Sequence, residues 1–100
     1  MEMLTEFFPV LDGFEWDDGN SLKSVRKHSV TQAESEQLFF NRPVVVTDSS
    51  VHSGEKRHFA LGKTDSARLL AVVFTIRNNR VRIISARPMS RKERGVYGKA

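Results

Sequence analysis

The stretch RLLAVVFTIRNNRVRIISAR, residues 68–87, decides the fold of this chain. Its first part, residues 68–76, is apolar at almost every position and rich in β-branched side chains, which is typical of a strand buried on both faces. Asn78 and Asn79 then allow a tight turn, and residues 81–87 follow as an antiparallel neighbour. The hairpin therefore predicts the centre of an antiparallel sheet.

Two further strands are predicted on the N-terminal side of this hairpin. Residues 44–50 form a β-branched run that leads into a polar loop, and residues 56–62 alternate between the two faces of a strand. Because each strand follows the previous one after a short connection, we expect the four strands to form an antiparallel meander.

Two helices are predicted before the sheet. The first runs to about Lys27 and follows a turn at residues 17–20, in which one of the two aspartates is the expected N-cap. The second opens at a capping box, with Thr31 as N-cap and Glu34 three residues later. It ends before Pro43, because a proline disfavours helical geometry in the residue that precedes it.

A third helix is predicted after the sheet. Ser90 and Glu93 form a second capping box, and Gly98 is a suitable stop for the helix that follows them. The expected fold class is α+β, with two N-terminal helices, a four-stranded antiparallel meander and a C-terminal helix.

The composition fits one globular domain of 100 residues, with 39% hydrophobic residues and seven Phe. The absence of cysteine excludes disulfides and thiolate metal sites, and it indicates an intracellular protein. The N-terminal sequence lacks the basic start and long apolar stretch of a signal peptide. The longest apolar run, Leu69–Phe74, is far shorter than the roughly 20 residues that span a membrane, so no membrane partner is expected.

Charge is distributed unevenly along the chain. Residues 1–50 carry four Lys or Arg against nine Asp or Glu, a net charge of −5, and residues 51–100 carry twelve against three, or +9, which leaves +4 for the whole chain. Such a split favours a nucleic acid or an acidic protein segment as partner of the basic half. The alternative is that the two halves fold together and neutralise each other.

The strand pattern predicts where the arginines of the basic half point. Alternation divides residues 81–87 between two faces, with Val81, Ile83, Ser85 and Arg87 on one and Arg82, Ile84 and Ala86 on the other. Arg77 is expected beside Val73 and Thr75, and Arg57 beside Phe59 and Leu61. If several of these arginines meet on one face, they form a cluster suited to phosphate, because a guanidinium grips two oxygens and stays charged.

Seven short motifs occur in the order and near the spacing of a known family. They are FEWD (14–17), KHSV (27–30), HSGEKR (52–57), LG (61–62), RLLAVVFTIR (68–77), RIISAR (82–87) and SRKER (90–94). Over residues 14–97 the chain resembles the BrnT-type toxins, the ribonuclease halves of bacterial type II toxin–antitoxin pairs. We therefore expect residues 14–98 to be one BrnT-like domain and residues 1–13 to be an extension.

The resemblance implies a fold similar to that of RelE-type toxins and cleavage of RNA without a metal or any other cofactor. It also implies a BrnA-type antitoxin, whose ribbon-helix-helix part binds DNA and represses the shared operon, and a place in the bacterial cytoplasm.

The chain departs from the family pattern at four positions. Asn20 replaces the usual lysine and Ser24 the usual asparagine. Ser29 stands in place of the KHGV glycine, so the turn after the first helix lacks its easiest left-handed residue. Pro88 stands where relatives often carry a charged or polar residue.

Metal-free cleavage of RNA needs three kinds of group. A base takes the proton of the attacking 2′-hydroxyl, an acid protonates the leaving 5′-oxygen, and cations stabilise the charge on the phosphorus. The cationic candidates are Arg57, Arg77 and Arg87. The acid–base candidates are His28, His52 and Glu55, and Lys27 can add a positive charge. Contacts to the RNA backbone are expected from Arg80, Arg82, Arg91 and Lys92.

Simpler roles remain open for several of these residues. His28 can cap the end of a helix, Glu55 can pair with an arginine, and Arg80 and Arg82 can simply solvate a turn. Two other classes of function also remain open. One is a catalytically inactive module that binds RNA, and the other is a protein whose basic half binds an antitoxin alone.

Overall fold

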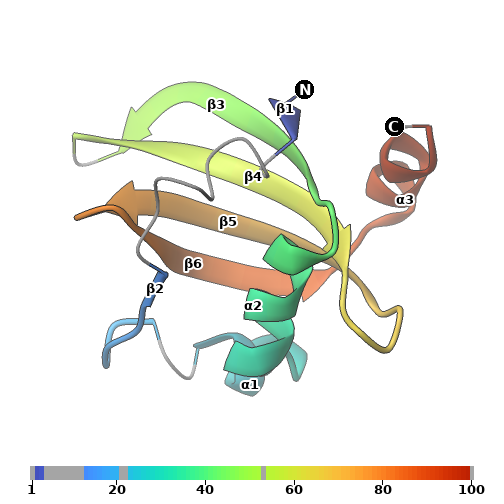
Figure 1. The fold of residues 1–100 in the computed structure, drawn as a ribbon, viewed down its shortest axis with the longest axis horizontal. Helices are drawn as coiled ribbons and strands as arrows, with labels where there is room; N and C mark the ends of the chain where they lie inside the picture. Colours follow the sequence, from blue (N-terminus) through green and yellow to red (C-terminus); the bar gives the residue numbers. More distant parts are fainter. Residues whose placement is uncertain (1, 4–12, 21–22, 53, 100) are drawn as a thin grey trace.

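The structure is a computed structural model that describes residues 2–3, 13–20, 23–52 and 54–99. In these ranges the chain forms one six-stranded sheet and three helices, shown in Figure 1. The strand order in the sheet is β1-β3-β4-β5-β6-β2. The fold is therefore α+β, as the sequence predicts.

The predicted four-stranded meander is confirmed. Its strands are β3 (Val44–His52), β4 (Glu55–Lys63), β5 (Leu69–Arg77) and β6 (Arg80–Pro88), and each is antiparallel to the next. The turn between β5 and β6 consists of Asn78 and Asn79, whose φ angles are 54° and 60°. Two positive φ angles in a two-residue turn match the right-handed twist of the strands, so asparagine suits both positions.

The expectation of an entirely antiparallel sheet is wrong. Strand β2 (Phe14–Glu15) lies parallel to β6, with Phe14 opposite Val81, and β1 (Glu2–Met3) adds an antiparallel edge to β3. Strands of two residues carry no usable periodicity, so their partners could not be read from the sequence. That residues 1–13 are an extension and residues 14–98 one domain stays a prediction.

The helices are α1 (Lys23–His28), α2 (Gln32–Phe40) and α3 (Arg91–Gly98). Both predicted capping boxes are present, at Thr31 and at Ser90. The prediction that Asp17 or Asp18 is the N-cap of α1 is wrong, because residues 18–20 form a turn and α1 begins at Lys23. The Asp17 carboxylate instead accepts a hydrogen bond from the Gly19 amide within this turn. No helix in the described part of the chain is long and apolar enough to cross a membrane.

The main core lies between the sheet and α2. In Figure 1, α2 lies in front of the sheet with α1 below it, whereas α3 stands beside the end of the sheet. The Phe39 ring of α2 makes edge-to-face contacts with Phe14 at 5.5 Å and with Phe74 at 5.1 Å between ring centroids. Leu38 is fully buried and packs onto Gly62 of β4. The aromatic and aliphatic residues of α2 therefore hold the helix against the middle of the sheet.

The turn after α1 shows the strain that its sequence predicts. Ser29 adopts a φ of 55°, the left-handed region that favours glycine. Arg68 supports this turn, because its guanidinium donates to the carbonyls of Ser29 at 2.8 Å and His28 at 3.1 Å. The same guanidinium pairs with Glu34 of α2 at 3.1 Å. Arg68 thus ties the end of α1 to α2.

Candidate functional site

A β-bulge in β6 decides which of its side chains share a face. Phe74 of β5 pairs with Ile83, but the preceding residue, Val73, pairs with Ser85. Ile84 is therefore an extra residue in β6, without a partner of its own across the ladder. Beyond it, the alternation of side chains between the two faces is reversed.

The bulge brings Arg82 and Arg87 onto the same face of the sheet. Arg82 pairs with Thr75 and Arg87 pairs with Ala71, two positions of β5 that share a face. Ala86 turns instead into the main core. The predicted division, with Arg87 opposite to Arg82, is therefore wrong, because a strict two-residue period cannot show an inserted residue.

Five arginines from three strands lie on this face, and one of them is Arg80, opposite Arg77 at the hairpin turn. The other four define what we call the arginine face. They are Arg57 of β4, Arg77 of β5, and Arg82 and Arg87 of β6. The pairing of β4 with β5 ends with His58 opposite Phe74, and one further step in this register places Arg57 across from Thr75. Helix α2 covers the opposite face and α1 packs against β6, whereas at the Arg87 end of the arginine face Leu61, Ala71 and Met89 form a second cluster with Tyr97 of α3.

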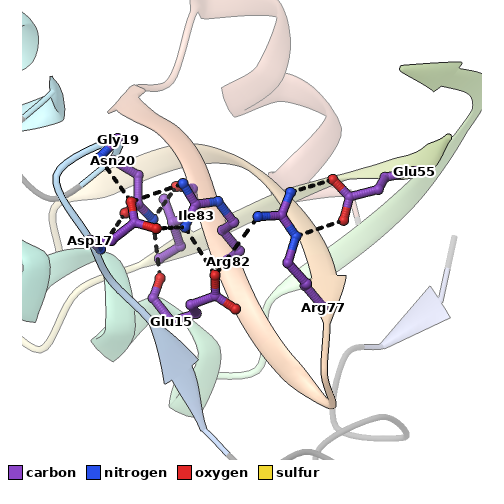
Figure 2. Close-up of polar contacts among 8 residues, drawn as sticks. All are labelled: Glu15, Asp17, Gly19, Asn20, Glu55, Arg77, Arg82 and Ile83. Atoms are coloured by element: carbon purple, nitrogen blue, oxygen red, sulfur yellow. Dashed lines mark hydrogen bonds and ion pairs between the residues drawn. The ribbon is translucent and has the colours of Figure 1, made fainter. Parts of the chain in front are cut away.

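A chain of ion pairs runs across the arginine face (Figure 2). Arg77 holds Glu55 through two hydrogen bonds of 3.0 and 2.6 Å, and its guanidinium lies 3.8 Å from Glu15. Arg82 donates to Glu15 at 3.1 Å and holds Asp17 at 2.8 and 3.0 Å. These hydrogen bonds lower the pKa of Glu55 and of Asp17, so both carboxylates are ionised at neutral pH.

Arg87, at the other end of the arginine face, is held by Glu93 of α3. Its guanidinium makes two hydrogen bonds of 2.6 and 2.8 Å with Glu93 and lies 5.8 Å from the centre of the Phe59 ring. Glu93 also accepts from the Ser90 amide at 2.7 Å in the capping box of α3. The hydrogen bonds from Arg87, with those from Ser90, lower the pKa of Glu93 to about 2. The start of α3 thus fixes the position of Arg87.

Replacement of Glu93 with glutamine should make the free energy of unfolding change less with pH between pH 4.5 and pH 2. A carboxylate whose pKa falls from 4.5 to about 2 on folding stabilises the protein above about pH 4.5, and the contribution disappears as the pH falls toward 2. Glutamine keeps the capping contact but loses the charge. We expect Glu93→Gln to lower the free energy of unfolding by roughly 1–2 kcal/mol at pH 7, since solvent screens part of the pair.

Urea unfolding of both proteins at several pH values measures this difference. It should shrink steadily between pH 4.5 and pH 2, because the wild-type carboxylate is then protonated as well. A difference that stays constant over this range would show that Glu93 acts through packing and not through its charge.

Arg57 differs from the other three arginines. Its side chain is half-buried, and among the side chains that the structure describes no carboxylate pairs with it. Its positive charge is therefore not compensated by these residues. A half-buried and uncompensated guanidinium is the most favourable place on this face for an added negative charge.

The predicted acid–base residues do not all lie on the arginine face. Glu55 does, and its backbone pairs with that of His52, whose side chain lies outside the described part of the structure. His28 and Lys27 come from the end of α1, which packs against β6 beside α2. Within the described part of the chain, no hydrogen bond or ion pair joins these two side chains to the four arginines. Their catalytic roles stay predictions.

The remaining predicted cations lie at the edges. Arg80 is exposed in the hairpin beside Arg77, and Arg91 and Lys92 are exposed in the first turn of α3. Nothing in the structure tests their predicted contacts with RNA. In the ranges that the structure describes, no three His, Asp or Glu side chains lie close enough together to hold a metal ion.

Asn20 has a role that the sequence did not reveal. Its side chain is only 5% exposed, and its amide group donates to the carbonyls of Glu15 at 3.1 Å and Ile83 at 2.9 Å. Its side-chain oxygen accepts from the Asp17 amide at 2.8 Å. Asn20 thus ties the loop after β2 to β6 and holds Glu15 and Asp17 next to Arg82.

Three carboxylates that pair with the arginines were not among the site residues predicted from the sequence. Glu93 was recognised only as a helix-capping residue, Asp17 as a candidate N-cap and part of the motif FEWD, and Glu15 only as part of that motif. The spacing of Glu15 and Asp17 was a usable signal, because residues two apart on an extended chain point to the same side. The arginine that they contact lies more than sixty residues away, at Arg82.

An α+β domain that gathers five arginines from three strands on one face has the arrangement expected of a protein that handles phosphate groups. The family model of the ribonuclease toxin BrnT, of type II toxin–antitoxin systems, matches residues 16–93. The chain therefore belongs to the BrnT family, as its motifs predict. A comparison with curated proteins finds no match. Membership of a type II toxin family implies an antitoxin as partner.

Proposed function

We propose that this protein is a metal-independent endoribonuclease that cleaves RNA and thereby inhibits translation until its antitoxin binds. The arginine face carries the proposal, because it presents the cations that cleavage at a phosphate requires. The antitoxin is proposed to be of the BrnA type, with a ribbon-helix-helix part that binds DNA, and the pair to act in the bacterial cytoplasm. The family to which the chain belongs supports the toxin function.

The proposed reaction is attack of a ribose 2′-hydroxyl on the neighbouring phosphate. The proton of that hydroxyl passes to a base, the 2′-oxygen bonds to phosphorus, and the 5′-oxygen leaves with a proton. Arg57 stabilises the extra negative charge on the phosphoryl oxygens, with Arg77 and Arg87 on either side. Glu55 is the proposed base, because it lies on this face and is ionised at neutral pH.

A second function is favoured by one specific observation. Arg77, Arg82 and Arg87 already hold carboxylates of the same chain, which leaves less free positive charge than a count of arginines suggests. A face of this kind also suits a catalytically inactive module that binds RNA or the antitoxin. Cleavage distinguishes the two functions.

The test is incubation of the purified protein with a single-stranded RNA of mixed sequence in EDTA, and a parallel incubation with ribosomes in a magnesium buffer, which intact ribosomes require. We expect fragments that end in a 2′,3′-cyclic phosphate, since the 2′-oxygen becomes bonded to phosphorus. A matched RNA with 2′-O-methyl groups throughout should remain intact. If folded protein binds both RNAs but cleaves neither, even on ribosomes, the protein is a binding module.

A further inference from the structure

One buried hydroxyl on the arginine face has no hydrogen-bond partner. Thr75, in the middle of β5, is 2% exposed, and its Oγ1 atom is the buried side-chain polar atom in the described part of the chain for which no partner is found. Buried polar atoms in proteins are nearly always hydrogen-bonded, and an unpaired one destabilises the folded state. The Thr75 hydroxyl is therefore free to donate a hydrogen bond to a ligand.

The position of Thr75 indicates what this ligand is. Thr75 lies opposite Arg82 in the ladder with β6, across from Arg57 one step beyond the His58–Phe74 pair of β4 and β5, and two residues before Arg77 on its own strand. Side chains at these positions point to the same side of the sheet. Thr75 thus lies within the arginine face, at a position that neighbours those of Arg57, Arg77 and Arg82.

We propose that Thr75 forms the floor of a phosphate site, in which its hydroxyl donates a hydrogen bond to a phosphate oxygen held by Arg57, Arg77 and Arg82. In the proposed function the phosphate belongs to the RNA backbone, so this inference rests on that function and adds a residue that contacts the substrate. A neutral hydroxyl donor beside three arginines suits a phosphate, which offers more acceptor oxygens than the guanidinium groups alone can satisfy.

The carboxylates on the face take the place of the phosphate in the free protein. Glu55 and Asp17 are each held in the fork of an arginine, which is also the geometry in which arginine holds a phosphate. The pair between Arg77 and Glu55 is partly exposed to solvent, and such pairs are weak. A phosphate can therefore replace Glu55 at Arg77 and reach the Thr75 hydroxyl once that side chain moves.

Thr75→Val and Thr75→Ser separate this role from a purely structural one. Valine keeps the shape of threonine without the hydroxyl, and serine keeps the hydroxyl. The melting temperature is measured in sodium phosphate and in sodium chloride of equal ionic strength. Fluorescence anisotropy measures the affinity for a 2′-O-methyl oligoribonucleotide, which is not cleaved.

We expect Thr75→Val to melt about 2–5 °C above the wild type in chloride, because an unpaired buried hydroxyl is removed. It should gain less stability from phosphate and bind the oligonucleotide roughly tenfold more weakly, since one hydrogen bond to a charged group is lost. Thr75→Ser should respond to phosphate and bind the oligonucleotide as the wild type does.

Two results would overturn the inference. Equal responses of the wild type and Thr75→Val to phosphate and to the oligonucleotide would show that the hydroxyl contacts neither. A lower melting temperature of Thr75→Val in chloride would show that the hydroxyl is already bonded in the free protein. Either result, combined with cleavage of RNA by the wild type, leaves the proposed function intact. A response to phosphate that depends on Thr75, without cleavage, supports the site and refutes the nuclease.

Discussion

Arg57→Ala is expected to lower the rate of RNA cleavage about 100-fold, the effect typical of removing one preorganised donor from a site where negative charge develops. Among the described side chains, Arg57 is the arginine of this face whose charge no carboxylate compensates. Its side chain is also only half-buried and belongs to neither hydrophobic core cluster, although β4 is a central strand of the sheet. Its removal should therefore impair the reaction more than the fold.

Two control variants show whether the lower cleavage rate of Arg57→Ala comes from the lost charge or from the lost geometry of the guanidinium group. Arg26→Ala removes the same charge from an exposed position on α1, so it should weaken long-range attraction of RNA without affecting the reaction. Arg57→Lys keeps the charge but loses the two-pronged geometry, and its rate should lie between those of the wild type and Arg57→Ala. The melting temperature of each variant shows whether it is folded.

Equal cleavage by the wild type and Arg57→Ala would place the reaction elsewhere or reveal a contaminating nuclease. Equal losses in Arg57→Ala and Arg26→Ala would show that Arg57 contributes only to the overall charge. A loss confined to the Arg57 variants supports a role at the reacting phosphate.

Gly62→Ala should destabilise the protein by about 1–3 kcal/mol, because the contact between β4 and α2 has no room for a methyl group. A Cβ atom at Gly62 would lie 2.8 Å from Cγ of Leu38, which is fully buried. The backbone of Gly62 has no positive φ angle, so the effect reports packing and not backbone strain. Leu38→Ala should cost about 2–5 kcal/mol through the cavity that it leaves.

The double variant tests this explanation. With Leu38 shortened to alanine, the methyl group at residue 62 enters the cavity, so Gly62→Ala should then cost little or even stabilise the protein. The control is Gly95→Ala, since nothing lies within 4 Å of a Cβ at that exposed helical position. It should raise the stability by roughly 0.5–1 kcal/mol.

Urea unfolding of the wild type, both single variants and the double variant gives the coupling between the two sites. Additive losses from Gly62→Ala and Leu38→Ala would contradict a direct contact as the cause. The position of α2 on the sheet would then depend on other residues.

The fold was largely predictable because its main elements have strong local signals. The apolar run of β5 and the asparagine pair after it defined the central hairpin, and Thr31 and Ser90 marked two helix starts through contacts within a single turn. Strand β2 gave no such signal, because two residues contain no period and its partner β6 is distant in the chain.

The site was less predictable, because it depends on contacts between distant residues. Arg57, Arg77 and Glu55 were identified as candidates and lie on one face. The pairing of Arg82 with Asp17 was not foreseen, since the sequence states which charges exist and not which of them meet. Thr75 was placed beside Arg77 but was given no role, because only the structure shows its hydroxyl to be buried without a partner.

By itself, the sequence determined the order and type of the main helices and strands, the family, and the excess of positive charge in the second half. These properties follow from local periodicity, from capping residues and from composition, none of which needs a partner far away in the chain. Only the tertiary structure decided which arginines share a face. The bulge at Ile84 reverses the alternation in β6, and Asn20 brings two carboxylates to Arg82 through hydrogen bonds that exist only after the chain has folded.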